Sequence, residues 1–428
     1  MSLEALPLEL PEVEQRAVMP AGFRAAARAA GIKASGGPDL GVLATAEAPA
    51  SVAATFTTNL LRAAPVEQSR AYLWASDPEG RGHWGRAHAV LSTSGCANAA
   101  TGDDGQLDQK VLAQALGAAL GVAPELTLAI STGLIGTRLP VDRIRSALGP
   151  LIAGLSWSDE ALAALAEQMM TTDSRPKWAT VRIELPADDG TPRPVTVSGI
   201  AKGVGMIHPR MATMLSLLLT DAAVQPATLH GLLLQAVERT WNQLTVDSDT
   251  STNDTVFLLA SGAARAPVMP GSTEAEALGQ AIRSVARSLA RQQAADGEGA
   301  TTLITCQVSG ARDDRQARAV ARAVVASNLV KAAVHGRDPN WGRIAAAAGN
   351  AQVDGRPIEP WPELRISLCG VDVFRGEPQP FDAAALSALM DAPEILIRLD
   401  LRDRDGTGEA FGCDLSEQYV LENSAYST

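Results

Sequence analysis

The feature that most constrains the fold of this chain is the alternation of helical and strand periodicity along its whole length. The stretch 228–241 places apolar residues at the spacing of one helix face, and Thr228 is predicted to cap the helix at its start. Further helices are predicted around 278–289 and 314–332, and strands at 301–308 and 395–402. Interleaved helices and strands favour a layered α/β architecture over an all-α or all-β fold.

Composition restricts the classes of function. A chain of 428 residues, 46% of them hydrophobic, can bury a substantial core without metal or disulfide support. The four cysteines lie far apart and form no CxxC pair, so we interpret them as reduced structural thiols. The five histidines form no HExxH motif and no i, i+4 pair, so the sequence predicts no metal site and no cofactor.

Charge and hydropathy indicate where the protein acts. The formal charge of −12, with no compensating basic stripe, argues against nucleic acid or an anionic membrane as a partner and favours small molecules. The N-terminal MSLEALPLELPEVEQ is acidic and interrupted by prolines, unlike a secretory signal peptide. Because no apolar run reaches the roughly 18 residues of a membrane span, we expect a soluble cytoplasmic protein.

Three short motifs carry candidate chemistry, each with a plainer reading. In SGIAKGVG, Lys202 is flanked by glycines but GxxxxGK[ST] is missing, so a substrate carboxylate is a better ligand for it than a nucleotide phosphate. In AISTGLIG, the hydroxyl of Thr132 and the N–H of Gly133 can converge on one oxyanion, or form an ordinary glycine turn. TVDSDTSTNDTV lacks the glycine and glutamate of a calcium loop and predicts a hydrogen-bonded turn bracing a strand.

Thr213 stands where a glycine-rich and proline-broken stretch meets an apolar run, in GMIHPRMATMLSLLLTDA. One interpretation is a helix cap or a buried β-branched residue. The other is chemical, because a threonine hydroxyl becomes a good nucleophile when a base lies next to it. A free α-amine on the same residue supplies that base, and cleavage of the Ala212–Thr213 peptide bond would create it.

These motifs occur in a series that resembles a known family. The series is GFRAAARAAGIK, STGLIG, MTTDSRPK, KGVGMIHPRMATML, DSDTSTNDT, GEGAT, DPNWGR, FGCDLSEQYV and ENSAYST, in this order. It is similar to the ornithine acetyltransferase family, the ArgJ-type glutamate N-acetyltransferases of the cyclic arginine pathway. The resemblance extends from residue 22 to Thr428 and implies an αββα-type sandwich of the DmpA/ArgJ-like kind.

The resemblance also implies roles for individual residues. Self-cleavage would give an α chain, 1–212, and a β chain, 213–428, whose N-terminal Thr213 is the nucleophile. Thr132 and Gly133 would form the oxyanion hole. The positions that match the family's substrate-binding residues are Thr171, Lys202, Thr213, Glu298, Asn423 and Thr428.

The implied reaction moves an acetyl group from N2-acetylornithine to glutamate through an acetyl-Thr213 ester, in arginine biosynthesis. Acetyl-CoA is a further candidate donor, although the sequence has no recognisable CoA motif. The implied assembly is an α2β2 heterotetramer or larger. Two alternatives remain open at this point: an N-terminal-nucleophile amidase or aminopeptidase that releases the acyl group to water, and an uncleaved paralogue that only binds acetylated amino acids.

Overall fold

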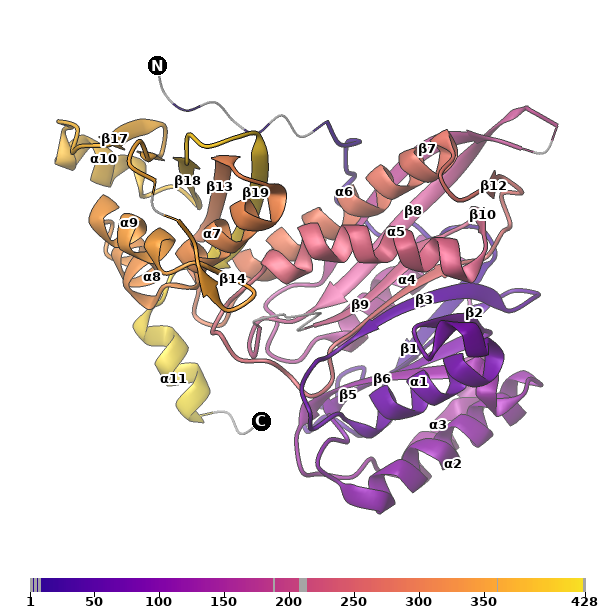
Figure 1. Cartoon of the computed structure of the whole chain (residues 1–428). Helices are drawn as coiled ribbons and strands as arrows, with labels where there is room; N and C mark the ends of the chain where they lie inside the picture. The colour runs from indigo at the N-terminus through magenta and orange to yellow at the C-terminus, as the bar shows by residue number, and fades with distance from the viewer. Residues whose placement is uncertain are drawn as a thin grey trace.

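The computed structural model describes residues 3, 6, 9–187, 189–207, 214–359 and 361–425. Helices and strands alternate through these ranges (Figure 1), which confirms the α/β prediction. In the described parts of the chain, none of the helices has the length and apolarity that a membrane crossing requires.

A central sheet runs through the main body of the molecule. Its strand order is β4-β3-β11-β9-β8-β7, and β9 and β11 form its parallel pair. The apolar run after Met214 becomes β9, whose side chains are buried on both faces of the sheet. The strands are β3 (Ala50–Phe56), β4 (Trp84–Ala87), β7 (Lys177–Pro186), β8 (Pro192–Lys202), β9 (Leu215–Thr220) and β11 (Thr255–Ala260).

A second sheet lies against one face of the central sheet. Leu217 and Phe257 of the central sheet share a buried cluster with Val90 and Ile130 of the second sheet. The helices α1 (Ala64–Ser76) and α4 (Asp159–Met169) contribute to this cluster and contact edge strands of the two sheets. In spatial order, the strands of the second sheet are β1 (Phe23–Arg28), β2 (Leu40–Thr45), β5 (Ala89–Cys96) and β6 (Thr127–Leu134).

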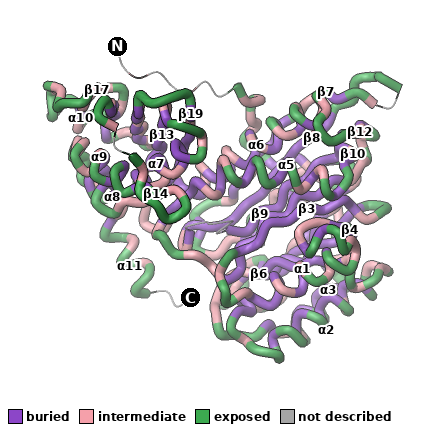
Figure 2. The backbone as a smooth tube through the Cα atoms, in the orientation of Figure 1, coloured by how far each residue is buried: buried purple, intermediate pink, exposed green. Residues whose placement is uncertain are grey.

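Helices cover the outer face of each sheet. Leu233 and Ile282, from α5 (Pro226–Arg239) and α6 (Thr273–Ala295), pack with Leu218 of the central sheet. Leu116, from α2 (Gly102–Leu120), packs with Leu91 of the second sheet, and α3 (Val141–Ala153) joins the same cluster. The layers are therefore helix, sheet, sheet, helix, which confirms the αββα prediction (Figures 1 and 2).

The C-terminal third of the chain forms a further sheet with its own core beside the sandwich (Figure 1). The resemblance to an αββα sandwich did not indicate this unit. Its strand order is β17 (Val371–Arg375), β16 (Arg365–Leu368), β18 (Glu394–Asp400), β13 (Leu303–Ala311) and β19 (Gly406–Cys413). Its helices are α7 (Asp314–Ala326), α8 (Asn328–His335), α9 (Trp341–Gly349) and α10 (Ala383–Leu389), and α11 (Glu417–Ala425) follows the last strand. Two short pairs of strands lie outside these sheets. β10 (Ala223–Val224) pairs with β12 (Pro267–Val268), and β14 (Gln352–Val353) pairs with β15 (Arg356–Pro357).

Two of the predicted helix boundaries were wrong. Thr228 is not a cap, because α5 begins two residues earlier, where Pro226 has a ring-fixed φ that suits the first helical position. The predicted helix 314–332 is two helices separated at Ser327, whose side chain accepts a hydrogen bond from the N–H of Val330 and caps α8. The remaining predicted helix, 278–289, lies within α6. The predicted strands 301–308 and 395–402 overlap β13 and β18 but differ from them by one to three residues at the ends.

Candidate active site

One pocket gathers all of the predicted site residues that the structure describes. It lies where the ends of β6 and β8 meet the loop after α6. Its volume is about 890 Å³, including the part that opens to solvent. The predicted residues that line it are Thr132, Gly133, Thr171, Lys202, Glu298 and Asn423. Thr213, Ala212 and Thr428, also predicted for this site, lie outside the described residues.

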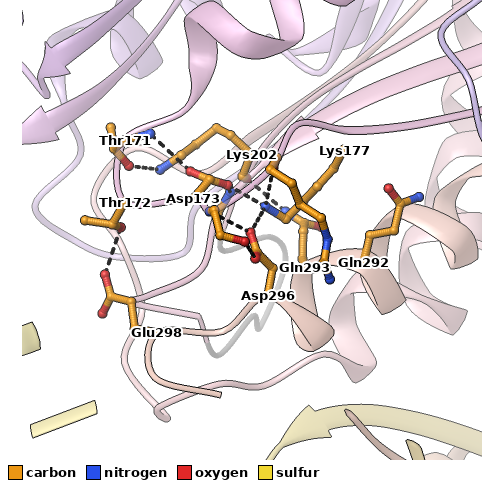
Figure 3. Close-up of polar contacts among 12 residues, drawn as sticks. Thr171, Thr172, Asp173, Lys177, Lys202, Gln292, Gln293, Asp296 and Glu298 are labelled. Atoms are coloured by element: carbon orange, nitrogen blue, oxygen red, sulfur yellow. Dashed lines mark hydrogen bonds and ion pairs between the residues drawn. The ribbon is translucent and has the colours of Figure 1, made fainter. Parts of the chain in front are cut away.

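Lys202, at the end of β8, forms the positive end of the pocket. Its Nζ donates a hydrogen bond to Thr171 Oγ1 at 2.8 Å (Figure 3). It donates another to Thr132 Oγ1 at 3.1 Å. A threonine hydroxyl has one proton to donate and two lone pairs to accept with. Because Lys202 donates to both hydroxyls, each of them keeps its own proton for a further acceptor.

Gly133 lies next to Thr132 in a backbone conformation that only glycine adopts easily, with φ of +128°. β6 approaches β5 so closely here that a Cβ on Gly133 would lie 2.3 Å from the carbonyl carbon of Gly95. No other residue type fits at this position. The sequence therefore places a backbone N–H and a hydroxyl, from neighbouring residues, beside the same pocket.

A buried ion cluster lies behind Lys202. Lys177, whose side chain is 0% exposed, donates from Nζ to Asp173 Oδ1 at 2.7 Å and to Asp296 Oδ2 at 2.6 Å (Figure 3). Asp173 also accepts from the N–H of Gly203 at 2.8 Å and of Thr171 at 3.1 Å. The cluster thus fixes the backbone on both sides of the Lys202–Thr171 contact.

Charges in this cluster shift the pKa values of the site. Burial lowers the pKa of Lys202, and the nearby carboxylate of Asp173 opposes that effect. Burial by itself would raise the pKa of Asp173, but Lys202 and Lys177 lower it to about 2. Asp173 is therefore ionised at neutral pH and helps Lys202 to keep its proton.

Glu298, in the loop after α6, forms the negative end of the pocket. Its Oε1 accepts from Thr172 Oγ1 at 2.9 Å, and its Oε2 accepts from Asn423 Nδ2 of α11 at 2.9 Å. The carboxylate lies against Gly205, where a Cβ would be 2.4 Å from Oε2. A cation and an anion at opposite ends suit a small molecule that carries a carboxylate and an ammonium group.

The segment 247–255 connects the two halves of the site. Asn253 Nδ2 donates to Ala97 O at 2.7 Å and to Ser131 O at 2.9 Å, which ties it to the strand that carries Thr132. Thr255 N donates to Met214 O at 2.9 Å, and Ile207 N donates to Asp247 Oδ1 at 2.8 Å. The polar run thus braces β11, as the sequence predicted, and it also holds the described residues on both sides of 208–213.

Asp254 is a buried acid in the pocket wall. Asp254 is 2% exposed, and its Oδ2 has no hydrogen-bond partner among the described residues. Burial raises the pKa of Asp254 well above its ordinary value. Burial thus favours the protonated form of this carboxyl.

Sequence reasoning missed the groups that support the site. Asp173, Lys177, Asp296 and Thr172 were not singled out, because each resembles an ordinary surface polar residue in the sequence. A signal existed for the first two, since Asp173 and Lys177 are four residues apart inside MTTDSRPK. Within the ranges that the structure describes, no group of three or more His, Cys, Asp and Glu residues could hold a metal ion, and the four cysteines are free thiols.

The protein is an αββα sandwich whose pocket contains both a lysine and a glutamate side chain. Sequence comparison assigns its family. A profile described as the ArgJ family matches residues 24–428. The arginine biosynthesis bifunctional protein ArgJ of Thermosynechococcus vestitus is 45% identical over 428 residues, covering 95% of this chain and 96% of the relative. The chain belongs to the ArgJ family.

Two solved structures are also similar in sequence. The arginine biosynthesis bifunctional protein ArgJ of Bacillus halodurans is 38% identical, with a TM-score of 0.48 over 50% of this chain and 100% of its own. The ornithine acetyltransferase of Mycobacterium tuberculosis, solved in complex with ornithine, is 35% identical. It has a TM-score of 0.41 over 47% of this chain and 99% of its own.

Proposed function

We propose that this chain transfers the acetyl group of N2-acetylornithine to glutamate. The observation that carries the proposal is the pocket, in which Lys202 with two threonine hydroxyls lies at one end and Glu298 at the other. N2-acetylornithine has an α-carboxylate for the first end and a distal ammonium for the second. Its acetyl group then lies on the side of Thr132 and Gly133.

Family membership supports this activity. Curated relatives such as the Thermosynechococcus vestitus protein carry the name arginine biosynthesis bifunctional protein. The word bifunctional supports a second acetyl donor besides acetylornithine, and acetyl-CoA is the candidate. We include cytoplasmic location and an α2β2 or larger assembly in the proposal, on the resemblance to the family alone.

The proposed chemistry uses Thr213 after cleavage of the Ala212–Thr213 bond. Thr213 Oγ attacks the acetyl carbonyl while the Thr213 α-amine takes the hydroxyl proton. Thr132 and Gly133 stabilise the oxyanion. The bond to the ornithine α-nitrogen then breaks, and this nitrogen receives the proton. In the second half-reaction the amine of glutamate attacks the acetyl ester, and Thr213 Oγ recovers its proton.

The position of the cut has a structural consequence. β8 ends at Lys202 and β9 begins at Leu215, and these two residues pair in the same antiparallel ladder. The proposed α chain, 1–212, and β chain, 213–428, would therefore share the central sheet. Hydrogen bonds between β8 and β9 would hold the two chains together after cleavage, so the chain boundary would not be a domain boundary.

The direct test is mass spectrometry of the purified protein with an assay of its products. We expect two chains separated before Thr213, and acetylglutamate formed only when glutamate is supplied with N2-acetylornithine. Thr213→Ala should stay whole and inactive, and Thr213→Ser should retain partial cleavage because the chemistry requires a hydroxyl. Free acetate as the product with and without glutamate would favour the amidase. An intact chain that binds acetylornithine without turnover would favour the binding protein.

A further inference from the structure

Two consecutive threonines connect the oppositely charged ends of the pocket. Thr171 Oγ1 lies 2.8 Å from Lys202 Nζ, and Thr172 Oγ1 lies 2.9 Å from Glu298 Oε1 (Figure 3). Two neighbouring side chains therefore place one hydroxyl at each end of the pocket. Of the two, Thr171 was predicted to contact substrate, whereas Thr172 has no assigned role.

The backbone around these threonines is held from behind. Asp173 accepts from Thr171 N, and Lys177 joins Asp173 to Asp296, two residues before Glu298. Glu298 N in turn donates to Val204 O at 2.9 Å, close to Lys202 in the chain. Since both ends are anchored through their backbones, the freedom that remains at the negative end is the direction of the Glu298 carboxylate.

That direction is set by neutral groups. Thr172 donates to one oxygen of Glu298 and Asn423 donates to the other, and Oε2 lies where a Cβ at position 205 would stand, so the glycine makes room for the carboxylate. Because both donors are uncharged, they orient the carboxylate and leave its negative charge available to a cation. Thr172 belongs to the anchored segment, whereas Asn423 lies on the exposed face of α11.

We infer that Thr172 is a specificity-determining residue of this pocket. Its hydroxyl turns the Glu298 carboxylate toward the distal cationic group of an amino-acid substrate whose α-carboxylate lies at Lys202. The inference rests on the proposed function, in which ornithine supplies that cation. It predicts that Thr172 governs the preference for a charged distal end over an uncharged one of the same length.

The test compares Thr172→Val with Thr172→Ser. Valine has the shape of threonine without the hydroxyl, and the site is exposed, so the fold should be retained. The measurement is kcat/KM for N2-acetylornithine divided by kcat/KM for N2-acetylnorvaline, which has the same carbon skeleton without the distal amine. We expect Thr172→Val to lower this ratio roughly fivefold to tenfold, the size of one typical net hydrogen bond, because the site is exposed to solvent. Thr172→Ser should stay near the wild-type ratio.

A ratio unchanged in Thr172→Val, whether kcat/KM stays the same or falls equally with both substrates, would overturn the inference. Calorimetry on the same proteins gives the ratio of dissociation constants for ornithine and norvaline, which tests the inference without turnover. A wild-type protein that transfers no acetyl group but prefers ornithine, and loses this preference in Thr172→Val, would contradict the proposed function and support the inference.

Discussion

The two charged ends of the pocket differ in burial and in the secondary structure that holds them. Lys202 is 8% exposed, ends a strand of the central sheet and rests on the buried Lys177 cluster. Glu298 lies in a loop and is contacted by Asn423 of α11, a helix in which none of the residues Glu417–Ala425 is buried (Figure 2). Under the proposed function, the rigid end meets the α-carboxylate that both substrates share. The exposed end meets the groups in which ornithine and glutamate differ.

The largest effect is expected from Lys177→Met, which breaks the rigid end. It removes the cation that Asp173 and Asp296 both bind directly, and loss of one partner of a buried pair costs about 3–5 kcal/mol. Urea unfolding should show this fall in the free energy of unfolding. Arg315→Met, which breaks an exposed ion pair with Asp354, is the control and should cost far less. Equal losses in the two variants would show that the Lys177 cluster gives no special rigidity.

The second prediction uses pH to sharpen the comparison. Asp173 helps Lys202 to keep its proton, so Asp173→Asn should lower the pKa of Lys202 further. Because carboxylate binding needs the protonated ammonium, kcat/KM should fall at a lower pH in Asp173→Asn than in the wild type. The alkaline limb of the pH profile of kcat/KM for N2-acetylornithine measures this shift.

Asp296→Asn is the matched control for that shift. Asp296 belongs to the same cluster and binds the same Lys177, but it is not among the charges that act on the pKa of Lys202. Its alkaline limb should stay close to the wild-type position even if stability falls. A limb that moves equally in both variants would mean that the cluster acts through packing rather than through charge.

The smallest effect on the fold is expected at the exposed end. Asn423→Ala removes one donor from Glu298 but no buried contact, so the free energy of unfolding should change by less than about 0.5 kcal/mol. KM for N2-acetylornithine should still rise severalfold, because the Glu298 carboxylate loses part of its orientation. Ser424 Oγ, on the same helix, donates to Leu421 O, so Ser424→Ala should leave KM unchanged. A large loss of stability in Asn423→Ala would contradict the exposed character of this end.

The sequence predicted more of the fold than of the residues that hold the pocket side chains in place. Apolar periodicity located α6, β13 and β18, because burial on one face repeats at a regular spacing. Motifs pointed to Thr132, Gly133, Thr171, Lys202, Glu298 and Asn423, which the structure places around one pocket. Their proposed roles, and those of Thr213 and Thr428, remain predictions.

The boundary at Ser327 shows why some local predictions were wrong. The apolar pattern across 314–332 is compatible with one helix or with two. The hydrogen bond from Val330 N to the Ser327 side chain, which starts the second helix, depends on the direction of the backbone after α7. The same limit applies to Asp296, which lies 119 residues from Lys177 in the chain and 2.6 Å from it in space. No local pattern contains such a pair.

By itself, the sequence determined the alternation of helices and strands, the family, and the residue types that could carry acyl transfer, because these depend on local spacing and on ordered motifs. Only the tertiary structure decided that Lys202 contacts Thr132 and Thr171, that a buried lysine anchors both ends of the pocket, and that Thr172 contacts Glu298. The physical reason is that these contacts join strands and loops far apart in the chain. Their strength comes from burial, which exists only once the sheets have packed.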